Sequence, residues 1–393
     1  PRKDDCYWES PFTSYTYDKY AYEEACRESV LDKRTYTLCD SLTATDASYL
    51  VEPVDGLWLL AIDGGVYLPK EMKDGKWTYQ GSSAGYNLVL KHKPFLLPWV
   101  RKVVEEARKR HKTLVAFSHY PLVDFNDGVS ESVHRMWGDR RFDLHRVPEA
   151  EVSEAFLQAG LRLHFAGHMH VNDTGIWEGK DGKHLYNIQV PSIATYVPAY
   201  KILTIESDEV FRVETVALDT VPGFDSLFPL YRAEYQSDSL KGHSPVWNKE
   251  ILSARTYGEF CDYQFRDLVR LRFIPRDLPE SWRACLDFTG ARMLKAVSGE
   301  DKANNVNWTG WCMKDLVLDV YRLRYAERLA LKDIPETRLA VYRYLFDRAR
   351  ISTFRSAEVE MVKGLGTLFL AFLNGEPCQN FVIDLEKDTI TGD

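Results

Sequence analysis

The sequence predicts a layered α/β fold with two facing sheets, followed by a mainly α-helical region. Helical and strand patterns alternate over residues 98–166, which is typical of a sheet covered by helices. Three apolar runs separated by polar turns follow between residues 185 and 218, and they indicate a second, more antiparallel sheet. Beyond residue 256 the apolar residues recur at helical spacing, which predicts the helical region.

The strands of the first sheet are predicted from short apolar runs. Residues 49–51 and 57–62 are two such runs, joined by a turn that contains proline and glycine. Residues 113–118 and 161–166 are two more, and each is followed directly by histidine-containing loops. Residues 64–95 contain several glycines and no long periodic pattern, so we expect them to be mostly loop.

Two helices are expected on the first sheet. Pro98 is a good first helical residue, and Trp99, Val103 and Ala107 fall on one face of the helix that follows it. A second helix is expected at residues 148–158. Each helix leads into a strand that ends at a histidine loop, and this alternation is typical of an α/β layered fold.

The strand pattern is broken at residues 219–229, which contain two prolines and a glycine. We therefore divide the chain into residues 1–218, with the two sheets, and residues 219–393, expected to be mainly helical. The apolar stretch 365–373 is about half the length needed to cross a membrane and is expected to be a buried central helix. Residues 380–383 look like a strand without an evident partner.

The composition describes an ordinary soluble globular chain of 393 residues with a formal net charge of −8. That charge argues against a broad surface for binding long nucleic acids, and no transmembrane segment is expected. Seven arginines of the helical region are interspersed with acidic residues, which favours a solvated helix surface over a phosphate-binding patch. They are Arg322, Arg324, Arg328, Arg338, Arg343, Arg348 and Arg350.

Three histidines are the candidate metal ligands. His119 follows the strand at 113–118, and the sequence G-H-M-H at 167–170 follows the strand at 161–166. His168 and His170 are two residues apart in an extended loop, so their imidazoles can reach two ions about 3.5 to 4 Å apart. Gly167 would let the loop turn tightly beneath them.

The S-H-Y-P sequence at 118–121 and the G-H-M-H sequence at 167–170 resemble, in type and order, two loops of the calcineurin-like metallophosphoesterases. The resemblance extends over about Tyr17–Asp173 and covers the later half of that catalytic domain. It implies an incomplete αββα sandwich in which His119 and His168 bind one divalent ion and His170 binds the other. The ions would be Mn, Fe or Zn, and the reaction would be hydrolysis of a phosphate ester by metal-activated water.

The chain departs from this family before His119. The family's early D-x-H, G-D and G-N-H loops are missing there, and the D-x-H at 143–145 and G-D at 138–139 come after His119 without a preceding apolar strand. We interpret both as coincidences. Three imidazoles leave two ions short of ligands, so we expect weak metal binding and no catalysis by this chain alone. No catalytic acid can be named.

Because the sequence starts at Pro1 without an initiator methionine, we expect it to begin inside a longer parent protein that supplies the missing loops. An alternative is a non-catalytic binding or interaction protein on a phosphoesterase-like scaffold. An upstream reading frame that encodes the missing loops would favour the enzyme. A mononuclear structural zinc site is a third alternative, but it lacks a fourth ligand, and the seven cysteines form no C-x-x-C pair.

The sequence leaves several properties open. It does not distinguish a phosphate monoester from a diester substrate, and it does not fix the metal or the oligomeric state. Some bacterial proteins that the chain resembles are exported, which favours an exported or periplasmic location.

Overall fold

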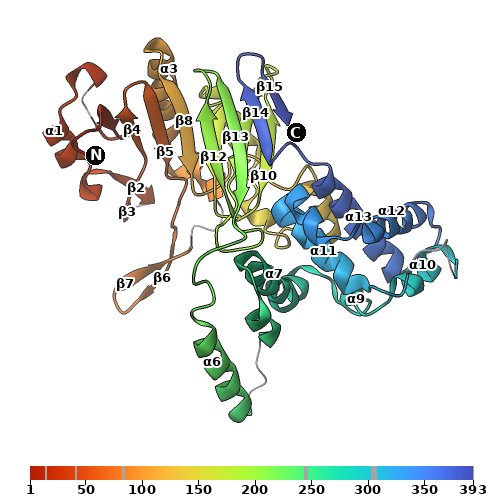
Figure 1. Ribbon diagram of the computed structural model, residues 1–393. Helices are drawn as coiled ribbons and strands as arrows, with labels where there is room; N and C mark the ends of the chain where they lie inside the picture. Colours follow the sequence, from red (N-terminus) through yellow and green to blue (C-terminus); the bar gives the residue numbers. More distant parts are fainter. Residues whose placement is uncertain (14–15, 40–41, 82–84, 243–246, 302–307, 393) are drawn as a thin grey trace.

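The computed structural model describes residues 1–392 except residues 14–15, 40–41, 82–84, 243–246 and 302–307. The chain forms a mixed α/β core and a helical region that lies beside one end of the sheets (Figure 1). The predicted α/β class with a helical C-terminal part is confirmed.

The first sheet has seven strands, and its centre is parallel. The order is β1 (Tyr7–Glu9), β4 (Tyr49–Val54), β5 (Leu57–Ile62), β8 (Thr113–Ser118), β9 (Leu163–Ala166), β11 (His184–Gln189) and β10 (Asp173–Glu178). β5, β8, β9 and β11 are parallel, whereas β1, β4 and β10 add antiparallel edges. Ser118 pairs with Ala166, so the carboxyl ends of β8 and β9 meet at one edge of the sheet.

Two helices cover one face of this sheet, as predicted. α3 (Leu96–Lys109) buries Trp99, Val103 and Ala107, and α5 (Ala150–Gln158) packs beside it. These residues share a core with Leu60 and Ala116 of the sheet. The face is buried because apolar residues recur every three to four positions along α3.

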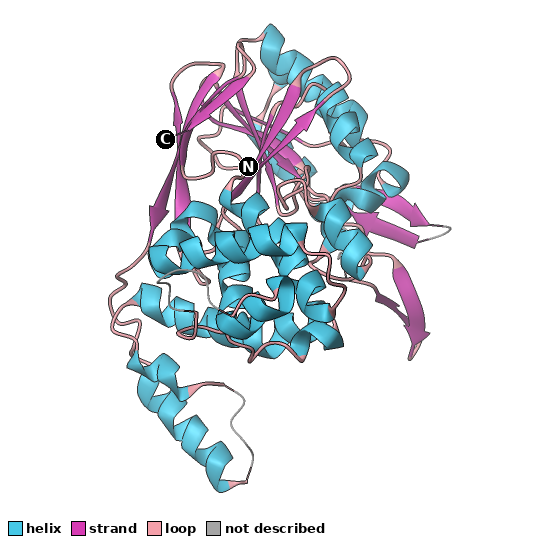
Figure 2. Ribbon diagram, turned by 90° about the vertical axis from the view of Figure 1, so that its right-hand side faces the viewer, coloured by secondary structure: helices cyan, strands magenta, loops and turns pink. Residues whose placement is uncertain are grey.

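The second sheet packs on the opposite face of the first and is antiparallel, as predicted, but the run at 185–190, which was expected in this sheet, forms β11 of the first sheet. Its strands are β12 (Ala199–Ile205), β13 (Val210–Ala217), β14 (Asn380–Asp384) and β15 (Thr389–Gly392). Val115 and Ile188 of the first sheet share a core with Phe211 and Phe381 of the second. Figure 2 shows the two sheets beside each other above the helical region. The predicted strand at 380–383 therefore has a partner, β13, far earlier in the chain.

Residues 64–95 are not mostly loop, contrary to expectation. They contain the hairpin β6 (Pro69–Lys73) and β7 (Lys76–Tyr79), the short helix η3 (Gly85–Leu88) and α2 (Val89–His92). Asp74 and Gly75 have φ angles of 50° and 74°, as a tight Asp-Gly hairpin turn requires. A second hairpin joins β2 (Thr35–Cys39) to β3 (Leu42–Thr45). The Asp74-Gly75 pair is a turn signal in the sequence, and it accounts for the hairpin in a segment expected to be loop.

The helical region surrounds one buried helix. Its longer helices are α6 (Phe228–Leu240), α7 (Tyr257–Leu268), α10 (Gly290–Ser298), α11 (Met313–Ala326), α12 (Glu336–Ile351) and α13 (Ala357–Leu373). α13 packs against α9 (Glu280–Arg283), α10, α11 and α12, and it buries Leu365, Leu368 and Phe369 as predicted. α6 projects away from the rest of the molecule (Figure 1). Among the described residues, no helix combines the length and apolarity needed to span a bilayer.

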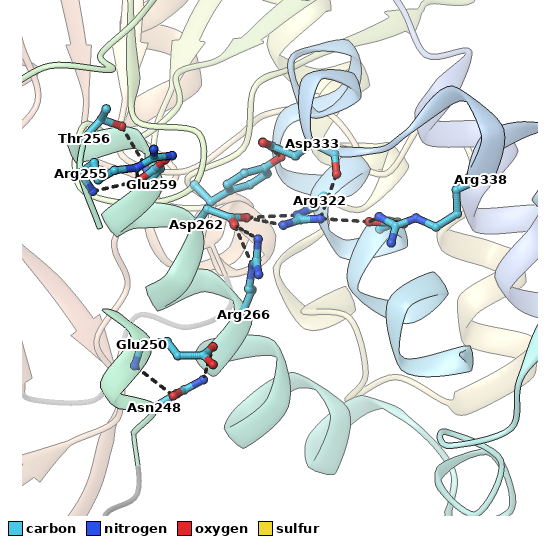
Figure 3. A network of polar contacts seen from close by, with 12 residues as sticks. Asn248, Glu250, Arg255, Thr256, Glu259, Asp262, Arg266, Arg322, Asp333 and Arg338 are labelled. Atoms are coloured by element: carbon cyan, nitrogen blue, oxygen red, sulfur yellow. Dashed lines mark hydrogen bonds and ion pairs between the residues drawn. The ribbon is translucent and has the colours of Figure 1, made fainter. Parts of the chain in front are cut away.

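Two of the seven arginines are buried, contrary to the prediction of a solvated surface. Arg322 is 3% exposed and donates to Asp262 Oδ1 at 2.6 Å and to Asp319 Oδ1 at 3.2 Å (Figure 3). Asp319 also pairs with Arg338 at 2.9 Å. The network joins α7, α11 and α12, and the acidic partners that suggested solvation instead neutralise charge inside the helical region.

Candidate metal centre

The three predicted histidines follow adjacent parallel strands. His119 comes directly after β8, and His168 and His170 lie in the loop after β9. The φ angles of His168 and His170, 62° and 57°, are left-handed, a conformation that non-glycine residues adopt only where the surroundings enforce it. The tight turn is therefore made by the two histidines themselves. Gly167, which we expected to make it, does not have a left-handed φ angle.

His119 and His168 are in direct contact. His168 Nδ1 lies 2.7 Å from His119 Nε2, and the two rings meet edge to face with centroids 4.6 Å apart. Two imidazole nitrogens that share one ion at about 2.0–2.1 Å in tetrahedral geometry are about 3.4 Å apart. At 2.7 Å the two nitrogens are at hydrogen-bond distance, so they would have to move apart by about 0.7 Å and turn both lone pairs toward the ion in order to share it.

The surroundings of His168 and His170 favour the neutral form of imidazole that binds metals. Burial, followed by the positive charges of Arg146, His119 and His170, lowers the pKa of His168 to about 4. Burial, and then the charge of His119, also lowers the pKa of His170. At neutral pH no proton has to be displaced from His168 before it can bind a metal.

A second layer of hydrogen bonds supports the loop of His119. Behind it, His164 is fully buried on β9, and its Nδ1 donates to Asn187 Oδ1 at 2.8 Å. Its Nε2 lies 2.9 Å from Ser118 Oγ, which also lies 2.7 Å from the carbonyl oxygen of Tyr120. Burial lowers the pKa of His164 to about 4, so this histidine is also neutral. His164 therefore packs within the sheet and positions the neighbouring loop.

His170 does not join the other two histidines in a three-nitrogen group. Among the described residues, one set of three ligating side chains has its donor atoms within 4.8 Å of one another, and it contains no histidine. Asp63 follows β5, the next parallel strand, but its carboxylate accepts from Ala47 N at 3.0 Å and pairs with the buried Lys93 at 3.1 Å. Asp63 is thus held in a structural ion pair.

The two motifs dismissed as coincidences lie in the long loop between β8 and β9. Asp143 is 5% exposed and pairs with Arg146 and Arg276, each at 3.1 Å. Asp139 is exposed and contacts His134. Both carboxylates therefore have partners other than a metal, in agreement with that interpretation.

The long loop between β8 and β9 is also in contact with the helical region. Arg324 of α11 donates to the carbonyl oxygen of Phe142 at 2.7 Å, and Asn172 N, just past the histidine loop, donates to the carbonyl oxygen of Tyr325 at 2.9 Å. Phe142 and Met169 belong to the core of the helical region. The histidine loops and the helical region therefore form one packed unit.

One further set of potential ligands was missed in the sequence. Asp127, Asp173 and Glu327 bring three carboxylates together from distant parts of the chain. Asp173 lies only three residues after His170, but nothing in the sequence connects it to Asp127 or Glu327.

Comparison with known proteins gives no family for this chain. No protein-family model and no curated protein matches it. The metallophosphoesterase resemblance therefore rests on the two histidine motifs and their places at the ends of β8 and β9.

Proposed function

We propose that this chain supplies the histidine side of a dinuclear metal centre that hydrolyses phosphate esters. The observation that supports this most is the contact between His168 Nδ1 and His119 Nε2, at the carboxyl ends of two adjacent parallel strands. Two imidazole nitrogens that face each other at such a strand edge are suited to one transition-metal ion. His170, on the same loop, would then bind a second ion.

The chemistry follows from the ligand type. Two Mn, Fe or Zn ions would polarise the phosphate oxygens and supply a hydroxide for in-line attack on phosphorus. The chain's own part would be to hold the imidazoles at the metals, and the positive charge of Arg146, which lowers the pKa of His168, acts on the same site. We propose that Arg146 contacts a phosphoryl oxygen. The remaining metal ligands would be carboxylates that do not contact His119 or His168 in the structure.

A second candidate is a non-catalytic binding protein built on the same scaffold. It is favoured by the shortage of ligands, since His119 and His168 have no carboxylate in their described contacts. It is also favoured by the packing of the helical region directly against the histidine loops, because a partner that binds the helical region would then lie next to the site.

Mn²⁺-dependent hydrolysis of an aryl phosphomonoester and diester distinguishes the two candidates. The chain is compared with His168→Ala and with His134→Ala, a control that removes an exposed histidine of α4 (Ser130–Trp137). Hydrolysis that is lost only in His168→Ala supports the enzyme. Mn²⁺ binding that depends on His168, without hydrolysis, favours the binding protein. If Mn²⁺ binding is absent or independent of His168, both candidates are refuted.

A further inference from the structure

Three carboxylates converge at the junction between the sheets and the helical region. They are Asp127 in the loop after β8, Asp173 at the start of β10 and Glu327 at the end of α11. One oxygen from each lies within 4.8 Å of the others. Two oxygens bound to one Ca²⁺ ion at about 2.4 Å are at most about 4.8 Å apart, so the set has the dimensions of a single cation site.

Two of these carboxylates are buried, and each keeps one oxygen without a hydrogen-bond donor, although they contact each other and Glu327 also contacts the Cys378 thiol. Asp173 and Glu327 are each 3% exposed, and neither Asp173 Oδ2 nor Glu327 Oε1 accepts a hydrogen bond from a described residue. A buried oxygen of an ionised group without a donor is strongly unfavourable, because it has lost its hydration and gained nothing in return. The orphaned oxygens therefore point to a positively charged ligand, independently of the clustering itself.

No side chain among the described residues supplies that positive charge through an ion pair. The nearby Lys201 is fully engaged elsewhere, since its ammonium donates to Asn172 Oδ1 at 2.7 Å, Thr215 Oγ1 at 2.9 Å and the Cys378 carbonyl oxygen at 2.6 Å. An ammonium has three N–H groups, and all three are directed to neutral oxygens. Lys201 thus lies beside the cluster without pairing with it.

The backbone holds the carboxylates in place. Asp127 and Glu327 have left-handed φ angles of 48° and 44°. The backbone of Gly375 packs against Asp127, since a Cβ atom there would lie 2.5 Å from Asp127 Oδ1. Three like charges are therefore kept together by four separate segments of the chain, an arrangement that is stable only if protons or a cation neutralise them.

We infer that Asp127, Asp173 and Glu327 form a binding site for a hard divalent cation of the Ca²⁺ type. All three ligands are oxygens, which favours Ca²⁺ or Mg²⁺ over the softer metals proposed for the histidines. The ion joins the loop after β8 and the start of β10 to α11, so it fastens the helical region to the sheets. The site is separate from the histidine centre and does not depend on the proposed hydrolysis.

The experiment is thermal unfolding of the intact chain, freed of metal with a chelator and then titrated with CaCl₂ or MgCl₂ at constant ionic strength. Because a ligand that binds only the folded state stabilises it, Tm should rise with the logarithm of the ion concentration above Kd. Glu327→Gln and Asp173→Asn preserve shape and remove one negative charge each. Either change should raise the concentration of ion needed for half of the Tm shift at least tenfold.

Two controls make the result specific. Asp74→Asn removes one exposed negative charge from the β6–β7 turn, and His168→Ala removes a nitrogen ligand of the histidine centre, so both should keep the full shift. In chelator, Glu327→Gln should unfold at the same or a higher temperature than the unmodified chain, since it relieves charge repulsion. The inference fails if neither ion shifts Tm, or if the shift persists unchanged in Glu327→Gln. Either result would mean that the carboxylates share protons instead.

Discussion

Replacement of His164 by glutamine should remove a large part of the acid sensitivity of this protein. His164 is fully buried, and burial lowers its pKa from 6.5 to about 4. The folded state therefore holds a neutral imidazole, whereas the unfolded chain takes up a proton as the pH falls below 6.5. The stability that depends on this histidine is present above pH 6.5 and is lost as the pH falls towards 4.

The magnitude follows from these two pKa values. Between pH 7 and pH 5, a single group of this kind lowers the free energy of unfolding by about 2 kcal/mol. The variant His164→Gln is neutral at both pH values and should not show this loss. At pH 7 it should be about 1–2 kcal/mol less stable, because the hydrogen bonds to Asn187 and Ser118 are weakened. The two proteins should then have nearly equal stability at pH 5.

Urea unfolding at pH 7 and pH 5 measures both quantities. The carboxylates contribute equally to the two proteins, so the difference between them isolates His164. His134→Gln, on an exposed position of α4, is the control and should retain the acid sensitivity of the unmodified chain. Equal loss of stability in His164→Gln and the unmodified chain would refute the account of His164 as the buried neutral support of the His119 loop.

Two other substitutions test the surroundings of the site. Lys93→Met should destabilise the fold by about 3–5 kcal/mol, as measured by urea unfolding, because it leaves the buried Asp46 carboxylate without its partner at 2.7 Å; a change below 1 kcal/mol would contradict the buried ion pair. Arg146→Gln should raise the pKa of His168 above about 4 in an NMR titration, since it removes a nearby positive charge; an unchanged pKa would place Arg146 away from the centre.

The local elements could be predicted well because each is encoded in a short stretch of sequence. The strands at 113–118 and 57–62 are continuous apolar runs, and α3 carries a clear apolar face. The pairing of residues 380–384 with β13 could not be predicted, because it joins segments separated by the whole helical region. The pairing of strands that are far apart in the sequence depends on tertiary packing, which a local sequence pattern does not predict.

The site, like the fold, combines features that follow from a local sequence pattern with features that depend on distant segments. The positions of His119 and His168 at strand ends follow from local pattern, whereas their contact required the pairing of β8 with β9. Burial of Arg322 could not be predicted from its acidic neighbours, since i to i+3 charge pairs look alike on a solvated helix and inside a packed bundle. The carboxylate cluster could not be predicted because its three members come from segments that are far apart in the sequence.

The most direct test of the proposed metal centre is a double-mutant cycle on Mn²⁺ affinity, measured by calorimetry for the unmodified chain, His119→Ala, His168→Ala and the double variant. If both imidazoles bind one ion, each single change should raise Kd at least about tenfold, and the double variant should lose less than the sum of the two effects. Effects that add independently, or affinity that is unchanged in both single variants, would contradict a metal ion shared by His119 and His168.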